Sequence, residues 1–150
     1  MSVSEKLSAL GIELPKSPAP AANYVPFVIS CQTIYVSGQL PMGPGGLVTG
    51  KLGAGLDVEA GAAAARFCGI ALLAQAQAAA GDLDRVRLVK LTGFVNSAPD
   101  FTDQPKVING ASDLMVDVLG DAGRHARSAV SAAALPFDVA VEIEGIFEMT

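Results

Sequence analysis

The stretch from Asp57 to Gly81 constrains the fold more than any other part of the sequence, because it predicts one long helix. Asp57 fits the N-cap, Glu59 suits the first turn, and Gly81 fits the left-handed position at which helices stop. Arg66, Gln75 and Gln77 interrupt its apolar run, which makes it too polar for a bilayer-spanning helix. We therefore expect a helix of a globular domain, with no membrane as a partner.

Several segments around this helix carry strand or helix patterns. The runs 24–30 and 33–39 predict a hairpin, and 85–95 has apolar residues on both faces, as a central strand does. Two more strands are predicted at 126–133 and 139–149. A second helix is predicted from about Asp103, because apolar residues recur with helical spacing at Val107, Ile108, Ala111, Leu114, Met115, Val118 and Leu119. This order predicts an α+β fold, a mixed β-sheet with two long helices packed on one face.

The N-terminal part adds a short helix and an arm. Ser2 and Glu5 form a capping-box pattern before a helix that ends near Gly11, and a proline-rich extended arm follows. We assign residues 1–150 to one domain, in which 1–21 form this helix and arm. A glycine-rich loop over 41–56 has room for a short strand around Leu47 and Val48. The N-terminus has no apolar signal-peptide core, so we expect a cytoplasmic protein.

Composition bears on the partners of the chain. Only 17% of the residues are charged and 51% are hydrophobic, which leaves little polar material to cover a monomer, so we expect an oligomer. The net charge is −5 and the basic residues are spread singly, which argues against nucleic acid as a partner. Cys31 and Cys68 lack metal or redox spacing, and we interpret them as reduced thiols.

Three motifs that could carry chemistry are incomplete. Gly45 to Lys51 has the spacing of a phosphate-binding loop, but Leu52 stands where a metal-binding hydroxyl is needed, so we interpret it as a loop at the rim of a site. His125 has no ligand partner at metal spacing, and we expect it to pack or hydrogen-bond at the start of a strand. Ser37 and Ser128 lack a histidine–acid pairing that the sequence supports.

The two C-terminal strands hold the best candidate. By the two-residue period of a strand, Arg127 shares a face with Ala129, Ser131 and Ala133. In the strand 139–149, the glutamates lie on one face and the apolar residues on the other. Arg127 could therefore stand over a shallow floor that admits a small ligand. It could equally form a structural ion pair with Glu142 or Glu144, and the spacing leaves both interpretations open.

The runs "ARSAV…LPFDVAVEIEGI" and "YVPFVIS…VSGQLP", together with Asn109, resemble the RidA/YjgF family of enamine/imine deaminases. The resemblance covers the chain from Tyr24 to the C-terminus. It implies a chorismate-mutase-like subunit, a homotrimer, and sites in the clefts between subunits. The implied reaction is hydrolysis of 2-imino acids, such as 2-iminopropanoate, to a 2-ketoacid and ammonia, without metal or organic cofactor.

The resemblance also implies residue roles. Arg127 would bind the substrate carboxylate through two N–H groups of its planar guanidinium, and Glu142 would hold or activate the attacking water. Glu144 is the alternative candidate for the role of Glu142. Tyr24, Gly38 and Asn109 fall on positions that line or shape the pocket.

Two positions depart from the family pattern, so pocket shape and substrate preference are open. Ala129 replaces a cysteine found in many deaminases of the family, and His125 replaces a proline. Two other functions stay open, a ribonuclease or translation-inhibitor activity and a non-catalytic binding of small ketoacids.

Overall fold

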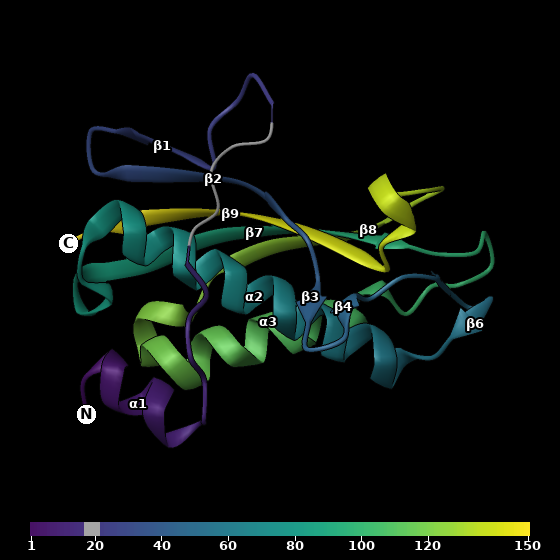
Figure 1. Ribbon diagram of the computed structural model, residues 1–150, viewed down its shortest axis with the longest axis horizontal. Helices are drawn as coiled ribbons and strands as arrows, with labels where there is room; N and C mark the ends of the chain where they lie inside the picture. The colour runs from purple at the N-terminus through teal and green to yellow at the C-terminus, as the bar shows by residue number, and fades with distance from the viewer. Residues whose placement is uncertain (17–21) are drawn as a thin grey trace.

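The computed structural model describes residues 1–16 and 22–150 and shows one five-stranded sheet backed by helices. Figure 1 shows the two long helices, α2 (Val58–Ala80) and α3 (Gln104–Leu119), packed on the same face of the sheet. The strands are ordered β1 (Phe27–Ser30), β2 (Thr33–Gln39), β9 (Val141–Met149), β7 (Val86–Asn96) and β8 (Ala126–Ala132). Among the neighbouring strands of this sheet, β7 and β8 pair in parallel and the others pair antiparallel, so the predicted mixed sheet and α+β fold are confirmed.

Smaller elements connect these. A short helix, α1 (Val3–Ala9), begins the chain, and four two-residue strands lie in the glycine-rich loop. They are β3 (Met42–Gly43), β4 (Gly46–Leu47), β5 (Lys51–Leu52) and β6 (Gly55–Leu56). The described residues also form the 3-10 turns η1 (Leu83–Arg85), η2 (Gly120–Gly123) and η3 (Pro136–Asp138). Residues 17–21 of the predicted arm lie outside the described residues.

The predicted helix ends are confirmed. Ser2 and Glu5 form the capping box of α1, and the Asp57 side chain accepts a hydrogen bond from the backbone N–H of Ala60 at the start of α2. Gly81 ends α2 with a φ of 81°, the left-handed conformation that glycine adopts without a steric penalty.

The two long helices pack very closely against each other. At Gly110 of α3, an added Cβ would lie 2.0 Å from the carbonyl oxygen of Ala62 in α2. Every apolar position predicted for the buried face of α3 is buried. By length and composition α2 could cross a membrane, contrary to the expectation from its polar residues, and half of that apolar window is buried inside the fold, as in a core helix.

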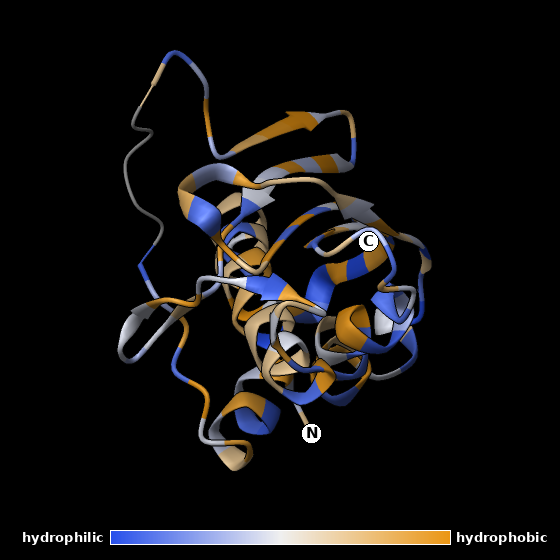
Figure 2. Cartoon of the chain, turned by 90° about the vertical axis from the view of Figure 1, so that its right-hand side faces the viewer, coloured by the Kyte–Doolittle hydropathy of each residue, from blue (hydrophilic) through white to orange (hydrophobic). Residues whose placement is uncertain are grey.

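The face of the sheet opposite α2 and α3 carries no long helix in the described part of the chain (Figure 1). The strand register places Val28, Tyr35 and Val130 on this open face, and each is 44% exposed or more. Figure 2 shows the β1–β2 hairpin at the top of the molecule with apolar residues along its first strand. The open face therefore exposes several apolar side chains, as surfaces that form interfaces often do.

A buried polar network fixes the turn between β8 and β9. Asn96, at the end of β7, is fully buried, and its amide nitrogen donates to Asp138 Oδ1 at 3.1 Å and to the carbonyl oxygens of Gly50 and Val139. Lys51 Nζ donates to Asn96 Oδ1 at 2.6 Å. The lysine of the incomplete phosphate-binding motif is therefore part of a structural network within the subunit.

Candidate functional site

Arg127 extends from the edge strand β8 toward helix α3. Its backbone pairs with Leu91, which is fully buried on the helix-covered face, so its side chain starts on that face. The guanidinium Nη1 donates to Ser112 Oγ and Nη2 donates to the Pro105 carbonyl oxygen, both at 3.2 Å. An arginine has about five N–H donors, so the others remain free to bind a ligand.

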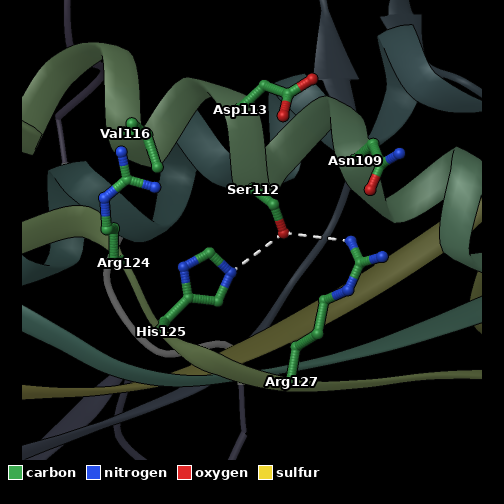
Figure 3. A pocket seen from close by; sticks show the side chains of 7 residues that line it. All are labelled: Asn109, Ser112, Asp113, Val116, Arg124, His125 and Arg127. Carbon is green, nitrogen blue, oxygen red and sulfur yellow. Dashed lines mark hydrogen bonds between the residues drawn. The ribbon is translucent and has the colours of Figure 1, made fainter. Parts of the chain in front are cut away.

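A pocket of about 290 Å³ lies between α3 and the start of β8 (Figure 3). It is lined by side chains of both elements, namely Asn109, Ser112, Asp113, Val116, Arg124, His125 and Arg127. Asn109 and Ser112 face the same side because residues three apart are neighbours on a helix. Figure 3 shows the Asp113 carboxylate turned away from Arg127. The pocket is thus polar, with positive charge at its strand side.

His125 links the backbone to this pocket. Its Nδ1 lies 2.6 Å from the carbonyl oxygen of Gly123, and its Nε2 lies 2.9 Å from Ser112 Oγ. The prediction that His125 hydrogen-bonds at the start of a strand is confirmed. Ser112 therefore contacts both His125 and Arg127, as the dashed lines of Figure 3 show.

The two arginines of the pocket differ in their charge partners. Arg124 pairs with Asp121 at 3.3 Å through an exposed side chain, an arrangement that contributes little to stability. Arg127 forms no ion pair within residues 1–16 and 22–150. A cation without a carboxylate partner, held against a helix by two hydrogen bonds, can take up an anionic ligand.

The alternative interpretation, an ion pair between Arg127 and Glu142 or Glu144, is wrong. Arg127 pairs with Leu91 and Glu142 pairs with Phe94, three residues further along β7. Because successive residues of a strand point to opposite faces, the two side chains lie on opposite faces of the sheet. Glu144 shares the face of Glu142 and is likewise out of reach.

Glu142 lies beside Gly38 on the open face. A Cβ added at Gly38 would lie 2.7 Å from Glu142 Oε2, so glycine leaves the space that this carboxylate fills. Burial, and then the charge of Glu144, raise the pKa of Glu142 above its ordinary value. A carboxyl group with a raised pKa gains and loses its proton closer to neutral pH than one with an ordinary pKa.

The other predicted residues are dispersed within one subunit. Asn109 lines the Arg127 pocket, whereas Tyr24, Gly38, Ala129 and Glu142 do not. Tyr24 is 58% exposed and precedes β1, and Ala129 packs against the hydrophobic core. Sequence reasoning missed Ser112, although its helical spacing from Asn109 could have indicated it.

A second cavity lies on the other long helix. It measures about 490 Å³ and is bordered by the N-terminal arm, the start of the glycine-rich loop and α2. Its walls are mostly apolar, with Arg66 and Glu13 as the charged side chains. Met42, Gly43 and Pro44 border this cavity and not the Arg127 pocket.

Residues 4–147 match the family model described as "YjgF/chorismate mutase-like, putative endoribonuclease". The chain belongs to the YjgF/RidA family. Within it, the chain is 55% identical to protein TCP17 of Trypanosoma cruzi, over 98% of this chain and 94% of TCP17. The resemblance to the YjgF/RidA family is therefore confirmed.

Solved structures of relatives share the fold. Protein Atu1372 of Agrobacterium tumefaciens, described as having unknown function, is 50% identical, with a TM-score of 0.91 over 99% of this chain and 92% of that chain. A more distant relative is TdcF of E. coli, solved with bound serine. It is 27% identical, with a TM-score of 0.64 over 90% of this chain and 94% of that chain.

Proposed function

We propose that this protein hydrolyses small 2-imino acids to 2-ketoacids and ammonia, with Arg127 binding the substrate carboxylate. The observation that carries the proposal is the Arg127 guanidinium, which has no acidic partner among the described residues and lines a polar pocket with Asn109 and Ser112. Membership of the YjgF/RidA family supports it. So does the serine bound to TdcF, because an amino acid presents the same carboxylate.

The reaction needs little from the protein. An imine carbon is already electrophilic, so water can add to the C=N bond once the substrate is held and its charge is neutralised. Ammonia then leaves as the carbinolamine collapses to the ketoacid. Glu142, whose pKa is raised, suits the removal of a proton from the attacking water. In this scheme neither a metal nor an organic cofactor takes part.

We further propose a cytoplasmic homotrimer that shares its sites between subunits. Arg127 and Glu142 lie on opposite faces of one subunit, so a site that uses both would combine the pocket of one copy with the open face of a neighbour. The uncovered apolar side chains of that face support the assembly. The sheets would then face one another around a central core.

The deciding experiment measures ammonia and ketoacid release from a freshly generated imine, over several amino-acid precursors, with and without the protein. Acceleration by the wild type that is lost in Arg127→Ala supports the deaminase. Binding of a 2-ketoacid without any acceleration would instead indicate a non-catalytic binding module.

A ribonuclease is the second candidate, because the family description names that activity. The net charge of −5 opposes tight binding of an RNA backbone. Incubation of the same preparation with a labelled single-stranded RNA separates the two functions. Cleavage that Arg127→Ala abolishes, without imine hydrolysis, would replace the deaminase by the ribonuclease.

A further inference from the structure

Three side chains of the Arg127 pocket and one backbone carbonyl beside it form a directed chain of hydrogen bonds. A guanidinium can only donate, and a backbone carbonyl can only accept. Arg127 therefore donates to Ser112 Oγ, and the Gly123 carbonyl accepts from His125 Nδ1, which must carry a proton. In the neutral imidazole this leaves a lone pair on Nε2, so the Ser112 hydroxyl donates to His125.

This direction gives Ser112 the properties of a nucleophile. Its proton points at the basic Nε2 of His125, 2.9 Å away, while its oxygen accepts from the positively charged Arg127. The Gly123 carbonyl holds the imidazole in one tautomer and orientation. A hydroxyl with an adjacent base, itself oriented by a third group, is the arrangement of an activated nucleophile. The guanidinium would in addition stabilise the alkoxide that forms when the proton leaves.

We propose that Ser112 and His125 form a nucleophilic pair that cleaves esters of small carboxylic acids. Ser112 Oγ attacks the ester carbonyl carbon, the bond to the alcohol oxygen breaks, and the acyl group is left on Ser112. His125 Nε2 takes the serine proton and passes it to the departing alcohol. Water, deprotonated by His125, then releases the acid and restores Ser112.

The surroundings of the pair set the substrate class. Asn109 lies one helical turn before Ser112 and, with the free N–H groups of Arg127, can donate to the developing oxyanion. The pocket of about 290 Å³ has room for a short acyl group. The inference does not rest on imine hydrolysis, because it uses the contacts of one subunit and does not involve Glu142.

The test uses the intact protein with two probes, p-nitrophenyl acetate and a fluorophosphonate. Hydrolysis of the ester is followed by absorbance, and the phosphonylated residue is mapped by peptide mass spectrometry. We expect wild type to turn over the ester and to be labelled at Ser112. Ser112→Ala should lose both. His125→Gln keeps an acceptor for the serine hydroxyl but cannot take its proton, so both rates should fall by about 100-fold or more.

Ser128→Ala is the matched control, because Ser128 is an exposed serine on the other face of β8 and should react like wild type. Circular dichroism and thermal melting confirm that each variant is folded. Absence of label at Ser112 in wild type overturns the proposal, as does an unchanged labelling rate in His125→Gln. If Ser112→Ala fails to fold, the proposal is still tested by the position of the label in wild type and by the labelling rate of His125→Gln. Imine hydrolysis, measured separately, reports on the deaminase alone.

Discussion

Arg127 and Glu142 lie on opposite faces of the same sheet, separated by the strand β7. Arg127 is anchored under α3 by Ser112 and Pro105, and Glu142 is seated against Gly38 on the open face. Within one subunit, the two residues that the family resemblance pairs in one reaction are therefore held by separate sets of contacts. A substitution at one of them leaves the contacts of the other within that subunit unchanged.

The planar fork of Arg127 should be required for binding. Arg127→Ala removes it, and Arg127→Lys keeps the charge but offers only a point donor. We expect both variants to lose 2-ketoacid affinity by about tenfold or more, together with most imine hydrolysis. Titration calorimetry and the imine assay measure the two effects. Arg124→Ala is the control, because Arg124 is already paired with Asp121 and should change little. Near-normal turnover in Arg127→Ala would contradict the proposed carboxylate contact.

Glu142→Gln should slow imine hydrolysis while carboxylate binding is kept, because an amide hydrogen-bonds but cannot accept the proton of water.

The stability of the protein should also change with pH because of Glu142. The folded pKa of Glu142 is raised, so the folded state binds more protons than the unfolded one between the two pKa values. The free energy of unfolding should therefore fall as the pH rises through that window, and less so in Glu142→Gln. Urea melts across pH check this, and equal slopes in both proteins would refute it.

Gly38→Ala tests the contact on the open face. The new Cβ would lie 2.7 Å from Glu142 Oε2, so the carboxylate must move, while the backbone at residue 38 has no need of a left-handed conformation. We expect a folded protein in which imine hydrolysis falls about as far as in Glu142→Gln. The double variant should lose no more than either single one, because both changes act through the same group. Additive losses would show that the two residues act independently.

Asn96→Ala should destabilise the fold without touching the Arg127 pocket. It leaves the Gly50 and Val139 carbonyls and Lys51 without their buried partner. We expect a loss of about 3 kcal/mol and a Tm lower by about 6–12 °C, measured by calorimetry. Asn109→Ala is the matched control, since Asn109 is exposed in the pocket and should leave the Tm nearly unchanged. An unshifted Tm in Asn96→Ala would mean that the network contributes nothing.

Sedimentation tests the proposed assembly. We expect a trimer at micromolar concentration, and dissociation in Tyr35→Glu, because this change places a charge among the apolar side chains of the open face. Gln77→Glu, on the exposed side of α2, should stay trimeric. A stable wild-type monomer would remove both the trimer and the shared site.

The elements could be predicted because their signals are local. The N-cap at Asp57, the stop at Gly81 and the apolar spacing of α3 each depend on residues within a few turns of one another. The two-residue period also assigned the glutamates of β9 to the face opposite its buried residues. These patterns, together with the order of the elements, were sufficient to predict the mixed sheet and the layer of helices on it.

The candidate site depended on contacts that sequence spacing does not encode. The sequence indicated Arg127 as a candidate, but whether it faced α3 or the glutamates of β9 depended on the register of β8 against β7. Ser112 and His125 are 13 residues apart and meet only because η2 turns the chain from α3 into β8.

Capping, side-chain periodicity and turn residues act over short distances, so the long helices and the strands of the main sheet could be predicted from local patterns. The contacts of Arg127 with Ser112 and of Glu142 with Gly38 arise only when the whole chain is folded. Strand register and helix docking are set by the packing of the entire core, and a shift of one residue would turn either side chain to the other face.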